Sequence, residues 1–116
     1  MADPLILNQR DPSQLFGQTG TAVVDFGPFP GRSDASVAVT GQTGINANAV
    51  LEAWIVATAT VDHSVDDHVF DAPSVKGGNI VPGAGFTIYA ASIPGIVSRN
   101  NPRNHGKWTV GWRWTN

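Results

Sequence analysis

The run Lys107-Trp108-Thr109-Val110-Gly111-Trp112-Arg113-Trp114-Thr115 decides the fold of this chain. Its large apolar residues stand at every second position, and a β-strand points every second side chain to the same face. That face carries Trp108, Val110, Trp112 and Trp114, and so holds three of the four tryptophans in the chain. Because large aromatic residues dominate core burial, we expect the face to fill the space between two packed sheets. The alternative is an exposed platform for a ligand or a neighbouring subunit, with Trp114 as its leading candidate.

Further short strands are predicted upstream, because apolar and β-branched segments alternate with turn residues. The 13 glycines and eight prolines mark the connections between them. The expected strands cover 21–26, 35–40, 50–61, 68–72, 79–81 and 86–91, with a polar loop at 62–67, a turn at 76–78 and an irregular loop at 92–106. The chain is therefore predicted to be all-β, a single β-sandwich of about 7–8 short strands with jelly-roll or Ig-like topology.

The first 20 residues differ in character from the rest of the chain. Pro4 and Pro12 interrupt any regular period, and polar residues separate two apolar spots. We therefore divide the chain into an extended N-terminal arm, residues 1–20, and a sandwich domain, residues 21–116. The arm is expected to grip a neighbouring chain through its apolar side chains, which are Leu5, Ile6, Leu7, Leu15 and Phe16.

Charged residues make up only 14% of the chain, below the usual quarter, which favours assembly over life as a free monomer. The signs are also segregated, since all nine acidic residues lie at or before Asp71 and only basic residues follow. Two interpretations stay open: strands of both halves interleave and neutralise one another, or complementary patches dock neighbouring copies. The basic cluster from Arg99 to Lys107 lacks interleaved aromatic residues, which argues against nucleic-acid binding.

The chain contains no cysteine, which excludes disulfides, thiolate metal sites and cysteine nucleophiles. No apolar run approaches the roughly 18 residues of a membrane-spanning helix, so no membrane insertion is expected. The N-terminal apolar stretch is too short for a signal peptide, and Asp3 stands where a basic region is required. The protein is therefore expected to be made and folded in the cytoplasm.

No constellation typical of an enzyme is present. No serine lies in an activated motif such as Gly-x-Ser-x-Gly, and no phosphate or dinucleotide loop occurs. Glu52 is the only glutamate and shares one side of its strand with Trp54, which is typical of a surface pair rather than an acid catalyst. The sequence therefore predicts a non-enzymatic protein without a cofactor.

The densest polar cluster is the segment 62–68, Asp-His-Ser-Val-Asp-Asp-His. Carboxylates suit Ca²⁺ or Mg²⁺ and imidazoles suit Zn²⁺ or Ni²⁺. The candidate ligands of such a cation loop are Asp62, His63, Asp66, Asp67 and His68. The segment lacks the turn glycine and distal glutamate of a dedicated calcium loop, so a solvated loop is favoured. A capping or turn role for Asp62 or Ser64 also fits.

Several segments resemble small, mostly uncharacterised proteins encoded by tailed bacteriophages and prophages. They are 21–45, Glu52-Ala-Trp-Ile55, 62–68, Gly85-Phe-Thr-Ile-Tyr89 and the final Trp-Thr-Val-Gly-Trp-Arg-Trp. The likeness spans about residues 20–116 and carries over no catalytic residue. It implies a virion context without a specific role.

We therefore expect a non-enzymatic structural component of a bacteriophage virion, acting as capsid decoration or as a tail-fibre or tail-tip element. It is expected to form a homo-oligomer, most simply a trimer, and to contact other capsid or tail proteins. One alternative is a carbohydrate-binding module that recognises a host surface glycan, and another is an internal tail or neck adaptor. The candidate ligand or subunit contacts are Trp54, Tyr89, Arg113 and Trp114.

Overall fold

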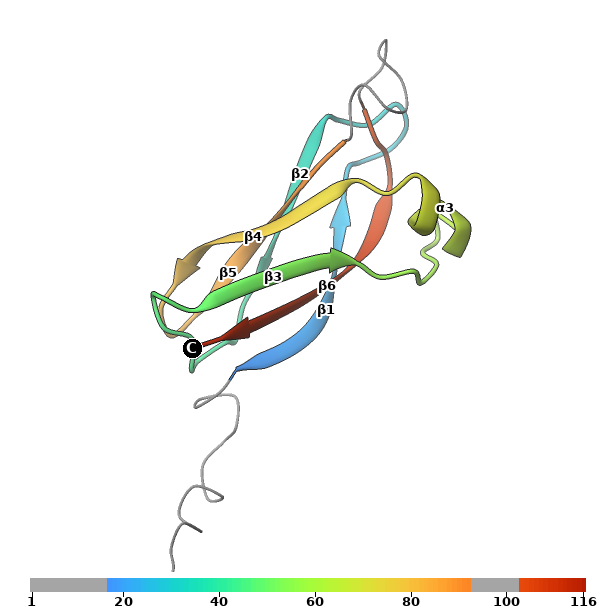
Figure 1. Ribbon diagram of the computed structural model, residues 1–116. Helices are drawn as coiled ribbons and strands as arrows, with labels where there is room; N and C mark the ends of the chain where they lie inside the picture. Colours follow the sequence, from blue (N-terminus) through green and yellow to red (C-terminus); the bar gives the residue numbers. More distant parts are fainter. Residues whose placement is uncertain (1–16, 93–102) are drawn as a thin grey trace, which may run out of the picture.

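The computed structural model describes residues 17–92 and 103–116 (Figure 1). These residues form two three-stranded antiparallel sheets, with strand orders β1-β6-β3 and β2-β5-β4. The elements are β1 (Gln18–Asp25), β2 (Asp34–Val39), β3 (Val50–Ile55), α3 (Val65–Phe70), β4 (Ser74–Val81), β5 (Gly85–Ala91) and β6 (Lys107–Thr115). The predominantly β architecture is confirmed, but the described residues form six strands and not the predicted seven or eight.

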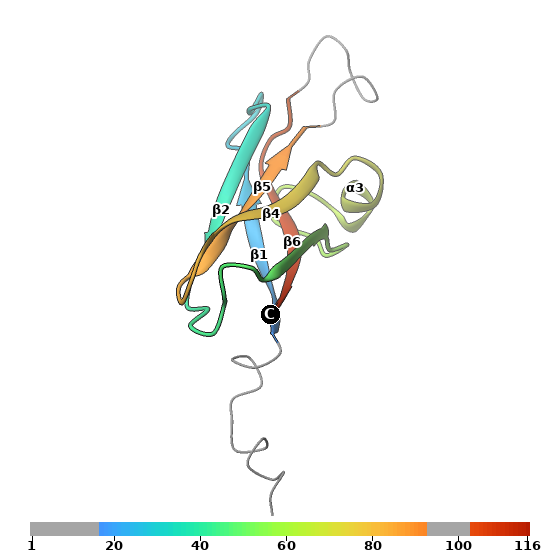
Figure 2. The ribbon, with the colours of Figure 1, turned by 60° about the vertical axis from the view of Figure 1, so that its left-hand side comes forward.

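The strands pair in a nested order along the chain. The first strand, β1, pairs with the last, β6, from Gln18↔Trp114 to Asp25↔Lys107. The second strand, β2, pairs in the same antiparallel sense with the penultimate strand, β5. Strands β3 and β4 complete the two sheets at their edges. In both ribbon views α3 lies at the side of the molecule, within the connection from β3 to β4 (Figures 1 and 2).

The tryptophan face of β6 forms the centre of the core. Trp108, Val110, Trp112 and Trp114 are each 5% exposed or less. Side chains of the facing sheet pack against them, as in the edge-to-face contact of Phe86 with Trp112 at 5.4 Å between ring centroids. The two sheets therefore enclose one hydrophobic core, an arrangement consistent with a β-sandwich. The core interpretation of this face is confirmed, and the alternative of an exposed indole platform is wrong.

Trp114 is fully buried, and its indole nitrogen is also satisfied inside the protein. Its Nε1 donates to Oε1 of the buried Gln42 at 2.9 Å, and Gln42 Nε2 donates in turn to the Thr40 carbonyl at 3.0 Å. The expectation that Trp114 contacts a ligand or another subunit is therefore wrong. An indole with no exposed surface and a paired N–H presents neither a ring face nor a hydrogen-bond donor to a partner.

The turn predicted at Lys76-Gly77-Gly78 is also wrong, because these residues lie inside β4. Packing across the molecule explains their place in a strand. A Cβ on Gly77 would stand 3.2 Å from Leu51 of β3, and one on Gly78 would stand 3.4 Å from the ring of Tyr89. The glycines thus serve the close approach of neighbouring side chains rather than a change of chain direction.

The long strand predicted at 50–61 ends at Ile55. Beyond Ile55 the backbone makes local hydrogen bonds: the Thr58 N–H donates to the Val56 carbonyl at 2.7 Å, and the Thr60 hydroxyl accepts from the N–H groups of Asp62 and His63. The solvated loop at 62–67 and the strand at 68–72 are wrong as well, since α3 spans Val65–Phe70. Ser64 caps this helix, as one of the sequence alternatives proposed.

The boundary of the arm also needs correction. Strand β1 begins at Gln18, so residues 18–20 belong to the sheet rather than to the arm. The structure places Gly20 opposite Trp112 in the β1–β6 register. The five predicted arm anchors, Leu5, Ile6, Leu7, Leu15 and Phe16, lie outside the described residues.

Candidate functional site

Trp54 lies on the outer face of the β1-β6-β3 sheet, 42% exposed. It stands opposite Gly111 in the strand register, and a Cβ on Gly111 would collide with its indole. The indole therefore rests over the backbone of β6. In the next register row Arg113 and Glu52 form an exposed ion pair at 2.8 Å. Trp54 and Arg113 are thus accessible neighbours. The ion pair of Arg113 with Glu52 joins a basic residue from the second half of the chain to an acidic residue from the first half.

Tyr89 lies on the outer face of the other sheet, 47% exposed, beside a hollow of about 590 Å³. Strand alternation and register bring six outward positions together there. One row holds Ser36, Tyr89 and Lys76, and the next holds Asp34, Ala91 and Ser74. No residue of β1, β3 or β6 lines this hollow, so it belongs to the surface of the β2-β5-β4 sheet.

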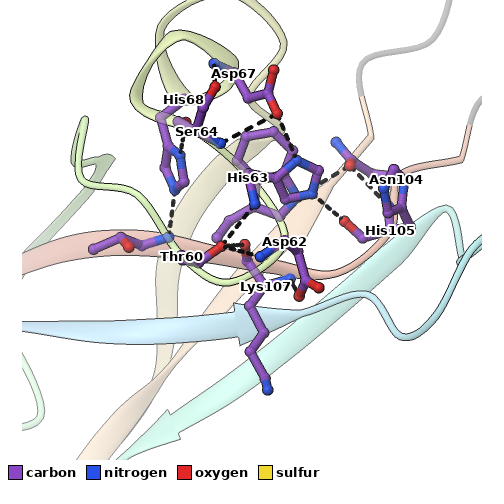
Figure 3. Close-up of polar contacts among 11 residues, drawn as sticks. Thr60, Asp62, His63, Ser64, Asp67, His68, Asn104, His105 and Lys107 are labelled. Carbon is purple, nitrogen blue, oxygen red and sulfur yellow. Dashed lines mark hydrogen bonds and ion pairs between the residues drawn. The ribbon is translucent and has the colours of Figure 1, made fainter.

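The three histidines form one cluster with Trp108. His63 stacks on the indole with ring centroids 3.8 Å apart, and His68 meets it edge-on at 4.9 Å. The ring of His105 lies 4.9 Å from that of His63. Figure 3 shows how residues 60–68 and 104–107 supply the side chains of this cluster. The cluster therefore ties the segment around α3 to the beginning of β6.

The two buried histidines have opposite hydrogen-bonding needs. Both nitrogens of His63 face oxygen atoms: Nδ1 lies 3.2 Å from Asp67 Oδ2, and Nε2 lies 2.6 Å from the His105 carbonyl. Both of these oxygen atoms are hydrogen-bond acceptors. The Nε2 of His68 instead accepts from the Thr109 N–H at 3.0 Å, so its Nδ1 carries the proton and donates to the Ser64 carbonyl at 2.8 Å. His68 therefore accepts on one ring nitrogen and donates from the other.

Asp67 links the helix cap to His63. The hydrogen bond from His63 holds the pKa of the Asp67 carboxyl below its usual range. The Ser64 N–H and the charge of His63 act in the same direction, and desolvation opposes them. The Ser64 hydroxyl accepts from the Asp67 N–H at 3.1 Å, which completes a capping box.

The cation-loop interpretation of this segment is contradicted. His63, Asp67 and His68 are engaged in the contacts above, and Asp62 accepts from the Lys107 N–H at 2.8 Å. Asp66 lies in the first turn of α3. Across residues 17–92 and 103–116, no group of three or more His, Cys, Asp or Glu side chains is placed to hold a metal ion. The polar side chains instead cap and anchor a short helix.

The segment around α3 also exposes apolar side chains. Val65 and Val69 stand four positions apart, on one face of the helix, and are 46% and 57% exposed. Phe70 at the end of α3 is 78% exposed, and Val61 before it is 85% exposed. We call Val61, Val65, Val69 and Phe70 the apolar set of α3.

Sequence reasoning missed most residues of the hollow, because the strand register alone brings them together. Arg32 stands just before β2, Asp34 begins that strand, Lys76 lies in β4, and none of them belongs to a local motif. The helix had a readable signal, since Ser64-x-x-Asp67 is the pattern of a capping box.

No protein-family model, curated protein or solved structure matches this chain. In the part of the chain that the structure describes, no helix is long and apolar enough to cross a membrane.

Proposed function

We propose that this protein is a non-enzymatic structural subunit of a bacteriophage virion, acting as capsid decoration or as a tail-fibre or tail-tip element. The observation that carries the proposal is the apolar set of α3, which leaves a phenylalanine and three valines in contact with solvent. Exposed apolar surface of this kind marks interaction sites. The low share of charged residues, 14%, supports the same conclusion. The subunit forms a homo-oligomer, with a trimer as the simplest state, and contacts other capsid or tail proteins.

We further propose that the fold is of the jelly-roll type rather than Ig-like. Rolling up one antiparallel ribbon pairs the first strand with the last and the second with the penultimate, which is the order found here. In an Ig domain the first and last strands belong to different sheets. Jelly rolls occur in viral capsid proteins and in lectins, so this analogy is compatible with both candidate functions.

Light scattering of the purified protein and quantitative gel analysis of particles test the assembly role. A soluble trimer present in hundreds of copies per particle supports capsid decoration, and a few to a few dozen copies support a tail element. A soluble monomer that is absent from particles contradicts the proposal.

Two variants examine the surfaces that assembly uses. Phe70→Asp is expected to dissociate the oligomer while the domain stays folded, because it places a charge in the apolar set of α3. Val23→Asp is the matched control, since Val23 is 46% exposed on β1, in the β1-β6-β3 sheet.

Deletion of residues 2–16 is expected to abolish incorporation into particles, which examines the arm separately. Normal incorporation of the truncated protein contradicts the role of the arm.

The second candidate function is a carbohydrate-binding module for a host surface glycan. It is favoured by Trp54 and Tyr89, two half-exposed aromatic side chains that lie on the outer faces of the sheets against Gly111 and Gly78. An aromatic ring held against a sheet offers its free face to the C–H groups of a sugar ring. A glycan array with wild type, Trp54→Ala and Tyr89→Ala tests this function, and the absence of any glycan-dependent signal in the wild type contradicts it.

A further inference from the structure

The hollow on the β2-β5-β4 sheet has the build of a small ligand site. In one register row Asp34 and Ser74 flank Ala91, whose single methyl group leaves the middle of the face recessed. The adjacent row places Tyr89 as a wall of this recess. The resulting volume of about 590 Å³ lies within the range of small-molecule pockets. We call this feature the Ala91 hollow.

The charged groups around the Ala91 hollow are not neutralised by one another. Within the described residues, the side chains of Arg32, Asp34 and Lys76 form no ion pair, in contrast to Arg113 and Glu52 on the other sheet. The backbone of Arg32 is nevertheless fixed, because its N–H and carbonyl both bond to Asn104 at 2.9 Å. Two cations and one carboxylate therefore face a recess with net positive charge.

The remaining groups suit a sugar ring. Tyr89 is 47% exposed, and its ring rests against Gly78, where a Cβ would stand 3.4 Å away. It therefore presents a supported aromatic face beside hydroxyl groups of Ser36 and Ser74. Asp34 accepts hydrogen bonds from sugar hydroxyls, and a guanidinium such as that of Arg32 binds a carboxylate in bidentate fashion.

We infer that the Ala91 hollow binds a saccharide that carries a carboxylate, such as a uronic acid unit. Tyr89 stacks on the ring, Asp34 orients its hydroxyls, and Arg32 and Lys76 bind the carboxylate. A neutral sugar has no anionic group that could pair with the net positive charge of Arg32, Lys76 and Asp34. This inference rests on the carbohydrate-binding candidate function and assigns it to one sheet face and one class of glycan.

An NMR titration of ¹⁵N-labelled full-length protein tests the inference with two probes, trigalacturonate and the neutral galactotriose of the same linkage. The acidic trisaccharide is expected to shift the resonances of residues 34–36, 74–76 and 89–91 and to bind at least about tenfold more tightly than the neutral one. Lys76→Gln and Tyr89→Ala are each expected to weaken this binding about tenfold. Trp54→Ala, on the opposite sheet, is expected to leave it unchanged. Lys76→Gln alters only an exposed side chain, so its effect does not depend on folding.

The outcomes separate the inference from the function on which it rests. Equal binding of both trisaccharides, or shifts centred on Trp54, overturns the assignment of the Ala91 hollow to an acidic saccharide while leaving carbohydrate binding in place. Equivalent shifts produced by acetate or inorganic phosphate alone overturn the saccharide assignment in favour of a simple anion site. No shift with either trisaccharide overturns the inference, whereas the carbohydrate-binding candidate is contradicted only when the glycan array also gives no signal; the assembly proposal is unaffected by either result.

Discussion

The imidazole of His63 lies nearly parallel to the indole of Trp108, with ring centroids 3.8 Å apart and an interplanar angle of 20°. His63 belongs to the segment before α3, whereas Trp108 begins the tryptophan row of β6. Stacking of these rings therefore joins the only helix among the described residues to the core of the β1-β6-β3 sheet. This contact gives the polar segment 62–68 a structural role.

Truncation of the stacked ring is expected to destabilise the domain. His63→Ala removes the contact with Trp108 and two hydrogen bonds, at a cost of about 2–4 kcal/mol in unfolding free energy. His63→Phe keeps the stacking and loses only the polar contacts, so its cost is expected to be about half as large. Urea denaturation followed by tryptophan fluorescence measures both values. Val65→Ala, at an exposed helix position, serves as the control, and equal stability of all four proteins contradicts the prediction.

The lowered pKa of Asp67 predicts a specific loss of stability in acid. Because its pKa is lower in the folded than in the unfolded chain, the carboxylate stabilises the fold at pH values above the unfolded pKa of about 3.9. This contribution disappears as the pH falls through the folded-state pKa. Asp67→Asn is therefore expected to be less stable than wild type at neutral pH, with the difference shrinking below about pH 4. Denaturation curves from pH 7 to pH 2 measure this, and Asp66→Asn in the same helical turn is the comparison. If the difference in stability between wild type and Asp67→Asn stays constant from pH 7 to pH 2, ionisation of Asp67 does not contribute to the stability of the fold.

Trp114 and Gln42 share a buried hydrogen bond. We therefore expect a substitution of Gln42 that keeps its approximate volume but removes its amide to destabilise the domain. Gln42→Leu leaves the indole N–H without a partner in the core and is expected to cost about 1–3 kcal/mol. Adding Trp114→Phe removes the orphaned donor, so the double variant is expected to lose less than the sum of the two single losses. Thermal and urea unfolding of wild type, the two single variants and the double variant completes this double-mutant cycle. If the losses in unfolding free energy of the two single variants add up to that of the double variant, the two side chains are not coupled.

Two glycines of the β1-β6-β3 sheet are expected to respond differently to the same substitution. A Cβ on Gly20 would stand 2.5 Å from Cζ2 of the buried Trp112, so Gly20→Ala is expected to cost about 1–3 kcal/mol by overpacking. A Cβ on Gly111 meets the half-exposed Trp54, which has room to swing away. Gly111→Ala is therefore expected to cost less and to increase acrylamide quenching of Trp54, measured in a variant with the other indoles replaced by phenylalanine. Similar costs at both positions contradict this distinction.

The alternation of β6 was readable from the sequence because a strand repeats every two residues. The same logic placed β2 and β5 within one residue of their observed limits. It identified only the end of β4, at 79–81, because Gly77 and Gly78 signal a turn unless Leu51 and Tyr89 are known to pack against them. It also missed α3, whose Ser64-x-x-Asp67 signature was outweighed by the β-branched residues on either side.

The local pattern of side chains was sufficient for the predominantly β class, the buried indole face of β6 and the lack of a recognisable catalytic motif. These properties follow from strand periodicity and from residue chemistry, which do not require the three-dimensional arrangement. The tertiary structure alone brings together Asp34, Lys76 and Tyr89 around the Ala91 hollow and His63 with Trp108, because both sites are built by strand register and by contacts between distant segments. It also determines which aromatics are accessible: Trp54 and Trp114 occupy paired strands of one sheet, but they point to its opposite faces.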